Sequence, residues 1–246
     1  MYWRELMLRF DNLSTDDALN AWMRESVKEC RSTYPLLLPK FPVAVDIGAN
    51  VGGFCVYAKN NFQKIYAFEP EAMNYAVLKS VKDQYQLDNV EIFNNAVYGK
   101  SNAKLTLRGF DNNHSKEVTC ADFEHKKFSD IGQQCETISL ADMIEALEIG
   151  HIDYLKMDCE GSEYDIFENF EDYHKISIIA LEVHGFYGEK RKSDLLKKLS
   201  KYYYFADHQA HGARIQPLQD LVKEMPPMDA LLNQHIFFLI NKKMMD

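Results

Sequence analysis

Two acidic residues that end apolar runs are the first candidates for chemistry in this sequence. Asp46 ends one run and leads into a turn that contains Gly48 and Gly52, and Glu69 ends the later run 64–68. A strand, a glycine-containing turn, a helix, a second strand and an acid form the unit that holds nucleotide-like ligands at the end of a parallel sheet. The glycines let the backbone approach the ligand, and the acid accepts hydrogen bonds from a ribose diol. The pattern therefore predicts a cofactor that contains a nucleoside.

The glycine spacing indicates which cofactor is bound. Three residues separate Gly48 from Gly52, so the Gly-x-Gly-x-x-Gly pattern of dinucleotide sites is missing, and the sequence also lacks Gly-x-x-x-x-Gly-Lys-Ser/Thr. An acid in the turn, Asp46, is unfavourable beside a phosphate and favourable beside a cation. S-adenosylmethionine carries an amino group and a sulfonium but no phosphate, so we expect it here. The alternative is an ordinary strand-to-helix turn whose glycines serve packing only.

A second set of polar side chains stands at the ends of two later apolar runs, 152–157 and 176–181. The first run is associated with Lys156, Asp158 and Glu160, and the second with Glu182 and His184. Because a sulfonium methyl is already a strong electrophile, catalysis needs mainly an acceptor oxygen held in line at roughly 3 Å. An alcohol acceptor also benefits from a base that takes its proton.

His184 is the favoured general base, because its ordinary pKa of about 6.5 suits proton transfer near neutral pH. A structural histidine is the alternative. Lys156 lies within an apolar strand, where a charge is costly unless it is paired. Strand alternation places it on the same face as Asp158, so a structural ion pair is the alternative to a catalytic lysine.

The elements that position these residues alternate regularly from residue 43 onwards. We expect parallel strands at 43–47, 64–68, 90–94, 152–157 and 176–181, with further strands at 103–107, 136–140, 202–205 and 235–240. We expect helices near 53–61, 72–85, 141–148 and 193–200. Segment 109–135 has poor periodicity and is predicted to be a loop insertion beside the site. The long connection between 205 and 235 is predicted to help form an acceptor pocket.

Residues 1–40 are predicted to be a helical extension. Ser14–Asp17 is a helix-start signal, apolar residues follow at helical spacing, and Pro35 closes the segment. We expect this helix to pack on the sheet domain or to cover the cofactor cleft.

Composition agrees with one catalytic domain in residues 41–246. The formal net charge of -9 argues against nucleic acid as a partner. The five cysteines are scattered without a Cys-x-x-Cys pair, so neither a zinc site nor a redox couple is indicated. The N-terminus does not read as a signal peptide, and no apolar run approaches the roughly 20 residues of a membrane span. A cytoplasmic location is therefore expected.

Five blocks, in this order and spacing, resemble the FkbM family of S-adenosylmethionine-dependent methyltransferases. They are Val-Asp-Ile-Gly-Ala-Asn-Val-Gly (45–52), Phe-Glu-Pro (68–70), Asn-Asn-Ala-Val (94–97), Leu-Lys-Met-Asp-Cys-Glu-Gly-Ser-Glu (155–163) and Leu-Glu-Val-His (181–184). The first block is typical of the wide class I methyltransferase fold, and the Lys-x-Asp-x-Glu-Gly block narrows the resemblance to FkbM. Residues 1–40 and 186–246 carry no motif of the family.

The resemblance implies an α/β fold of the Rossmann-like class I type. This is a three-layer sandwich around a mostly parallel seven-stranded sheet with an antiparallel last strand. It also implies O-methylation of a hydroxyl on a sugar, glycan or small metabolite. The implied cofactor-binding residues are Asp46, Gly48, Asn50, Gly52, Glu69, Asn95, Ala96 and Asp158. The catalytic candidates, chosen from their place at the strand ends, are His184, Asp158, Lys156 and Glu160.

Other interpretations stay open. The chain could be a nicotinamide-dependent oxidoreductase, or a protein that binds S-adenosylmethionine without catalysis. A divalent metal held by Asp158 with Glu182 or His184 is possible, as in some related O-methyltransferases, but no motif with metal-ligand spacing supports it. Glu163 is expected to cap the following helix. His114, His125, His208 and His211 lie in predicted loops, where they are either solvated or part of an acceptor pocket. The aromatic-rich first ten residues could form a homo-oligomer interface.

Overall fold

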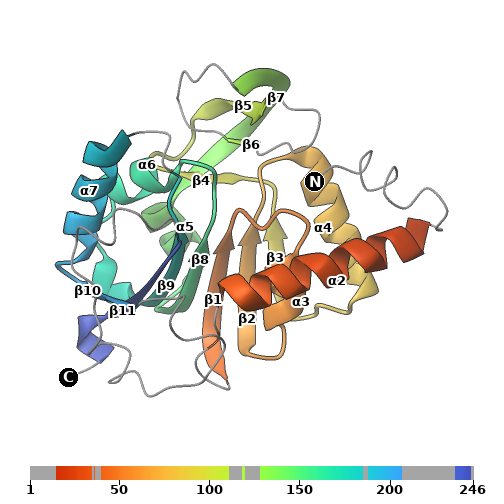
Figure 1. Cartoon of the computed structure of the whole chain (residues 1–246), viewed down its shortest axis with the longest axis horizontal. Helices are drawn as coiled ribbons and strands as arrows, with labels where there is room; N and C mark the ends of the chain where they lie inside the picture. Colours follow the sequence, from red (N-terminus) through yellow and green to blue (C-terminus); the bar gives the residue numbers. More distant parts are fainter. Residues whose placement is uncertain are drawn as a thin grey trace.

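The structure is a computed structural model of the 246-residue chain, and it describes residues 15–34, 36, 40–110, 118–119, 128–184, 188–206 and 236–244. A seven-stranded sheet forms its centre (Figure 1). In spatial order its strands are β10 (Tyr203–Ala206), β11 (Ile236–Asn241), β9 (Ile176–Glu182), β8 (Ile152–Met157), β1 (Phe41–Ile47), β2 (Phe62–Phe68) and β3 (Val90–Phe93). β11 alone runs in the opposite direction to the other six strands of this sheet. The predicted mostly parallel sheet with an antiparallel last strand is confirmed.

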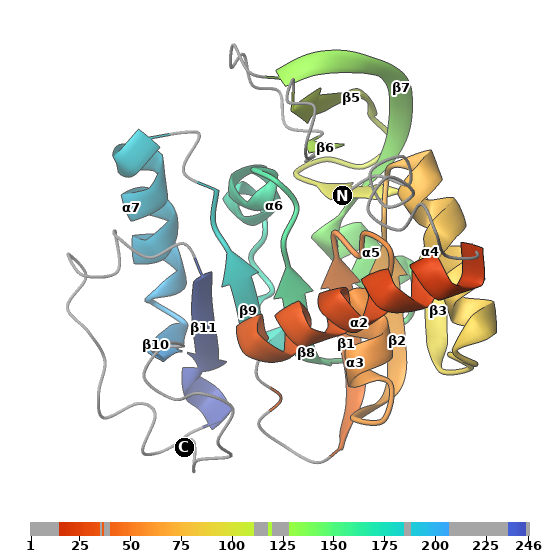
Figure 2. The same ribbon diagram turned by 45° about the vertical axis from the view of Figure 1, so that its right-hand side comes forward.

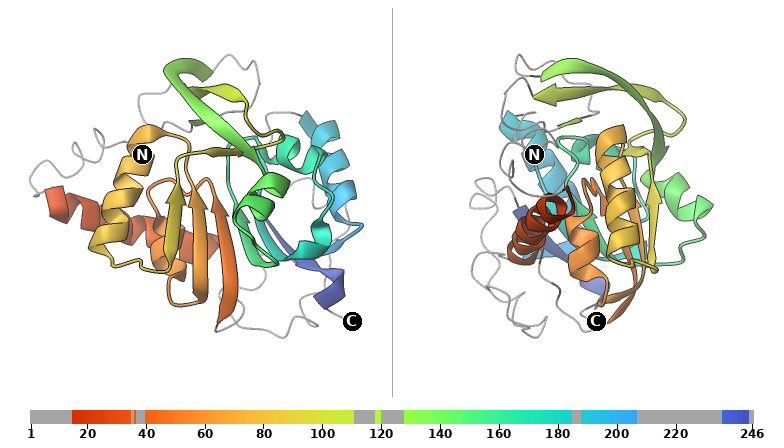
Figure 3. Two further views of the ribbon diagram at one scale, coloured as in Figure 1. Left: turned by 180° about the vertical axis from the view of Figure 1, so that it is seen from behind. Right: turned by 90° about the vertical axis from the view of Figure 1, so that its right-hand side faces the viewer.

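Helices cover both faces of this sheet and make three layers. On one face lie α2 (Thr15–Thr33), α3 (Gly53–Ala58) and α4 (Ala72–Gln84), and on the other lie α5 (Leu140–Ala146), α6 (Glu163–Glu168) and α7 (Gly188–Leu199). Short 3-10 helices are Tyr173–Lys175 and Lys242–Met244. The right-hand view of Figure 3 shows α2 and α5 on opposite sides of the sheet.

The two apolar cores follow from strand alternation. Tyr154 and Leu155 are neighbours in β8 and both are fully buried, but Tyr154 belongs to the core under α2–α4 and Leu155 to the core under α5–α7. Central strands covered on both faces must be apolar almost throughout, which explains the almost wholly apolar sequence of β9. The sheet therefore holds its polar residues at strand ends, where the site lies.

A second, four-stranded sheet lies beyond the carboxyl ends of β1, β2 and β3, at the top of Figure 1. Its strands, in order, are β4 (Ala96–Tyr98), β7 (Phe128–Ser139), β5 (Lys104–Phe110) and β6 (Val118–Thr119). The prediction of a loop insertion over 109–135 is wrong for 109–110, 118–119 and 128–135. The long strand β7 is held by backbone pairing with β5, and its polar sequence lacks the apolar alternation by which strands are recognised.

The predicted N-terminal helix is confirmed from Thr15 as α2, which lies across β8, β1 and β2 in Figure 2. Its buried residues Leu19, Trp22 and Met23 share one core with α3 and the sheet. The boundary between 1–40 and 41–246 stays a prediction. Among the described residues, no helix combines the length and the apolar character that crossing a membrane requires.

Candidate active site

A cavity of about 510 Å³ lies between α2 and the carboxyl ends of β1, β2, β8 and β9, a size usual for small-molecule sites. Ten of the residues predicted from the sequence line it. They are Gly48, Asn50, Glu69, Asn95, Ala96, Lys156, Asp158, Glu160, Glu182 and His184. Asp46 and Gly52 do not line it, and their contacts with a cofactor stay predictions.

Helix α2 forms one wall of this cavity. The residues that it and its end contribute are Trp22, Glu25, Ser26, Glu29, Cys30, Thr33 and Tyr34. The N-terminal helix therefore both packs on the sheet domain and covers the cleft, as expected from the sequence.

The glycine turn after β1 is shaped by close backbone approach. Gly48 has φ +78°, and a Cβ built on it would lie 1.8 Å from the carbonyl oxygen of Asp158, so only glycine fits. The N–H groups of Gly48 and Ala49 both donate to the carbonyl of Phe68, at 3.1 and 2.9 Å. The turn therefore contacts both β2 and the segment after β8, and we call this turn the floor of the cavity.

Beneath this floor lies a buried ion pair. Asp46 and Lys156 are register partners in β1 and β8, and Lys156 Nζ lies 3.1 Å from Asp46 Oδ1. Lys156 Nζ also donates to the carbonyl of Gly48 at 2.6 Å. Burial would lower the pKa of Lys156, but the charges of Asp46 and Asp158 outweigh it and hold the pKa above its ordinary value. Lys156 is therefore a charged residue that supports the turn, with Asp46 rather than Asp158 as its nearer partner.

Glu69 is a buried carboxylate with its orientation fixed by N–H groups. Its Oε2 accepts from the N–H of Asn50 at 2.8 Å. Its Oε1 accepts from the N–H of Glu71 at 3.0 Å and from Asn74 Nδ2 at 3.5 Å. Burial raises the pKa of Glu69 to about 7, although these donors act in the opposite direction. With one N–H donor, Oε2 keeps a lone pair for a ligand hydroxyl.

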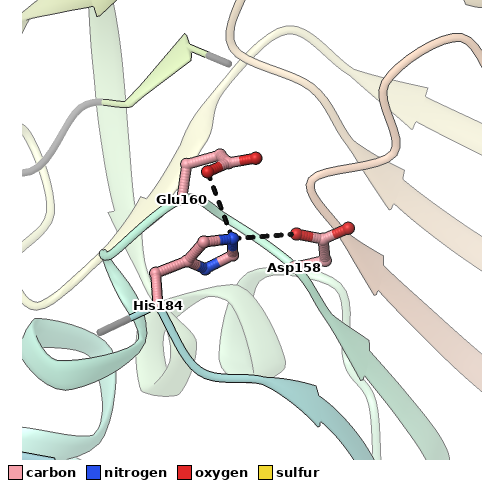
Figure 4. Close-up of side chains that lie close together, drawn as sticks. All are labelled: Asp158, Glu160 and His184. Carbon is pink, nitrogen blue, oxygen red and sulfur yellow. Dashed lines mark ion pairs between the residues drawn. The ribbon is translucent and has the colours of Figure 1, made fainter. Parts of the chain in front are cut away.

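Asp158, Glu160 and His184, which we call the acid–histidine cluster, meet at the ends of β8 and β9 (Figure 4). His184 Nε2 lies 3.1 Å from Glu160 Oε2 and 3.8 Å from Asp158 Oδ1. Glu160 has φ +55°, a left-handed conformation that is strained for a non-glycine residue and is frequent at functional sites. The sequence predicted each of these residues separately, and the structure brings them together.

Glu163 stands behind this cluster. It is fully buried at the start of α6, and its Oε1 accepts from His184 Nδ1 at 3.0 Å and from the N–H of Cys159 at 3.2 Å. The expected cap position is taken by Ser162. Glu163 therefore sits in the first turn, where the dipole favours an acid, and its side chain holds the histidine ring.

His184 was predicted to be the general base because of its ordinary pKa, and its surroundings in the structure shift that pKa. Burial would lower its pKa, but the hydrogen bond and charge of Glu163, together with the charges of Glu160 and Asp158, outweigh burial and raise the pKa to about 10. In this arrangement His184 is an imidazolium at neutral pH and has no free lone pair. Its ordinary pKa therefore does not apply here.

Tyr34 is a site residue that the sequence interpretation missed. Its hydroxyl donates to Asp158 Oδ2 at 3.1 Å and lies 3.5 Å from Glu182 Oε2. Burial and the charge of Asp158 raise the pKa of Glu182 to about 7. Nothing in the sequence around Tyr34 indicates this contact, because it joins residues 124 and 148 positions apart. The predicted loop histidines at 114, 125, 208 and 211 lie outside the described residues.

Comparison with known proteins identifies the family. The Methyltransferase FkbM domain matches residues 46–221. A protein named Methyltransferase 1 from Beauveria bassiana is 22% identical over 165 residues, which are 60% of this chain and 65% of that protein, slightly under two thirds of its length.

Two solved structures are also similar. One is a methyltransferase FkbM from Methylobacillus flagellatus. It is 18% identical, the match covers 82% of this chain and 53% of that one, and the TM-score is 0.48. The other is a putative methyltransferase from Streptococcus mutans in complex with SAH, which is 11% identical, with a match that covers 88% of this chain and 97% of that one and a TM-score of 0.47. The domain match covers well over half of the sequence and includes every residue of the acid–histidine cluster. The chain belongs to the FkbM family of methyltransferases.

Proposed function

We propose that the chain is an S-adenosylmethionine-dependent O-methyltransferase whose acceptor is a hydroxyl on a sugar, glycan or small metabolite. The observation that carries this proposal is the shared cavity: Glu69 and the acid–histidine cluster line the same space. A ribose-binding acid and a set of proton-accepting groups therefore stand where a donor and an acceptor can meet. Membership of the FkbM family supports methyl transfer.

The cofactor would extend from Glu69 toward Asp158. Glu69 would accept hydrogen bonds from the ribose diol, with Asn95 and Ala96 beside the adenine. Gly48 and Asn50 would contact the methionine part. Asp158 would face the sulfonium or the amino group, since both are cationic and its carboxylate is their natural partner.

The acceptor oxygen would then lie beside the acid–histidine cluster. Methyl transfer forms an O–CH3 bond and breaks the S–CH3 bond, leaving the neutral thioether S-adenosylhomocysteine. The hydroxyl proton passes to a carboxylate of the cluster. Protonated His184 would hold Glu160 and Asp158 in place rather than take the proton itself. Lys156, predicted as catalytic, would act by holding the turn at Gly48.

The charge of the cavity supports a neutral or cationic acceptor. Among the described residues that line it, the carboxylates are Glu25, Glu29, Glu69, Asp158, Glu160 and Glu182. The cationic candidates in that lining are Lys156, which is paired with Asp46, and His184. A phosphate or a nucleic-acid backbone would meet repulsion here.

Acceptor screening with methyl-labelled S-adenosylmethionine tests the proposal. Hydroxylated acceptors are paired with analogues in which the hydroxyl is blocked as a methyl ether. We expect label in the free-hydroxyl compounds and none in the blocked ones. Transfer to an amine or a carbon would refute O-methylation. Tighter binding of NADH than of S-adenosylmethionine would support the oxidoreductase alternative, and cofactor binding without any product would support a non-catalytic protein.

A further inference from the structure

The acid–histidine cluster has the donor atoms and spacing of a metal site. One imidazole nitrogen and two carboxylate oxygens, from His184, Asp158 and Glu160, lie within 4.8 Å of one another. Divalent cations bind such atoms at about 2.0–2.2 Å, so ligand atoms around one ion lie about 3–4 Å apart. The distances of 3.1 and 3.8 Å from His184 Nε2 to its two partners agree with this geometry.

Glu163 and Tyr34 hold two of these three side chains in the way that metal ligands are commonly oriented. A metal-binding histidine usually donates its other ring N–H to a carboxylate, which fixes the ring. His184 Nδ1 has this contact with the fully buried Glu163, at 3.0 Å. The Tyr34 hydroxyl holds Asp158 Oδ2 at 3.1 Å, and the other oxygen of Asp158, Oδ1, is the one nearer His184. His184 Nε2 and Asp158 Oδ1 therefore face the same point, where a bound metal ion would replace the proton on Nε2.

The local charge also favours a cation. Asp158, Glu160, Glu163 and Glu182 bring four carboxylates to this end of the cavity, while Lys156 lies nearer to Asp46 than to Asp158. Even one charged histidine leaves an excess of negative charge. In addition, Oε2 of Glu163 is buried and has no hydrogen-bond partner among the described residues. A buried carboxylate oxygen in this state is costly unless positive charge lies nearby.

We propose that Asp158, Glu160 and His184 bind a divalent transition-metal ion on the acceptor side of the cavity. The imidazole favours transition-metal ions such as Zn²⁺ or Fe²⁺ over Mg²⁺ and Ca²⁺, which prefer oxygen ligands alone, and the two carboxylates also suit Mn²⁺, which serves as the probe. Three protein ligands leave coordination positions for an oxygen of the acceptor. An ion there would lower the pKa of a bound hydroxyl and fix its direction. This inference rests on the proposed transfer to a hydroxyl and names how that hydroxyl is held.

Binding of Mn²⁺ to the chelator-treated full chain tests the proposal, with free Mn²⁺ measured by electron paramagnetic resonance. We expect one saturable site per chain. Glu160→Gln should weaken Mn²⁺ binding at least tenfold. Glu163→Gln should weaken it 10- to 100-fold, as is usual for groups that orient a metal ligand. Glu29→Gln is the matched control, because it makes the same change on the helical wall of the cavity, and should leave Mn²⁺ affinity unchanged.

Titration of each variant with S-adenosylhomocysteine separates this proposal from the proposed function. Loss of Mn²⁺ binding with cofactor binding retained supports the metal site in a folded protein. If a variant does not fold, the wild-type titration decides, and no saturable Mn²⁺ site there overturns the proposal. Equal Mn²⁺ affinity in wild type and Glu160→Gln overturns it too. If chelator-treated protein methylates hydroxyls at full rate, the metal proposal fails while the O-methyltransferase stands. Mn²⁺ binding without any methylated hydroxyl would refute the O-methyltransferase proposal and leave the metal site in place.

Discussion

Replacing Glu69 by Gln should remove a pH dependence of cofactor binding that the wild-type protein shows near neutrality. The pKa of Glu69 is raised by burial to about 7, above its ordinary value, so the carboxyl group loses its proton as pH rises through 7. A carboxylate accepts hydrogen bonds from both ribose hydroxyls, whereas the protonated form offers fewer acceptors. Affinity should therefore increase from pH 6 to pH 8.

The expected size follows from the ionised fraction. With a pKa of about 7, roughly one molecule in eleven is ionised at pH 6 and roughly ten in eleven at pH 8. If only the carboxylate binds the diol, the apparent dissociation constant falls about tenfold over this range. Glu69→Gln should show no such change. At pH 8 it should bind about 1–3 kcal/mol more weakly, the cost of leaving a buried polar partner unsatisfied.

Isothermal titration with 5′-methylthioadenosine is the assay, because this ligand has the ribose but no amino acid group that titrates near neutrality. Glu91→Gln is the control, since Glu91 is exposed and pairs with Lys64 on the surface. It should keep the wild-type slope. A flat wild-type profile, or the same slope in Glu69→Gln, would refute the assignment of this acid to the ribose.

Three further substitutions test the floor and wall of the cavity. Lys156→Met should cost about 3–5 kcal/mol in urea unfolding, because it leaves Asp46 charged and buried without its partner; wild-type stability would contradict this, and adding Asp46→Asn should recover part of the loss. Tyr34→Phe keeps the ring but removes the hydroxyl that donates to Asp158, so calorimetry should show a loss of about 1–3 kcal/mol. An unchanged melting temperature would mean that this hydrogen bond is dispensable. Gly48→Ala should abolish folding or S-adenosylhomocysteine binding, because the added Cβ would lie 1.8 Å from a backbone oxygen. Gly132→Ala, at φ +74° with open space around it, should cost only about 1–2 kcal/mol of stability. Equal effects of the two substitutions in circular dichroism and in titration would show that the close backbone approach at Gly48 is not decisive.

The site was predictable wherever a residue follows a strand directly. Glu69, Asp158 and His184 could be placed at the carboxyl edge of a parallel sheet from the order of apolar runs alone. Their protonation could not, because it depends on neighbours distant in sequence. Glu163, 21 residues before His184 in the chain, is the main reason why the histidine is an imidazolium rather than the neutral base that its ordinary pKa suggested.

The fold shows the same division. The large sheet was predictable because buried parallel strands must be apolar. The first part of strand β7, residues 128–135, was not, because it pairs with β5 through the backbone while its polar sequence shows no regular apolar alternation. A local pattern of apolar residues indicates which side chains are buried. Backbone pairing between distant segments has little effect on composition, so it is hard to predict.

By itself the sequence predicted the cofactor class and identified the family, since the glycine turn, Glu69 and the Lys-x-Asp-x-Glu-Gly block are each short patterns of residues close together in the chain. Tertiary structure decided how these residues act. It paired Lys156 with Asp46, placed α2 and Tyr34 over the cleft, and joined Asp158, Glu160 and His184 in front of Glu163. Charge and proton position arise from side chains that meet through space, so only the folded chain could determine them.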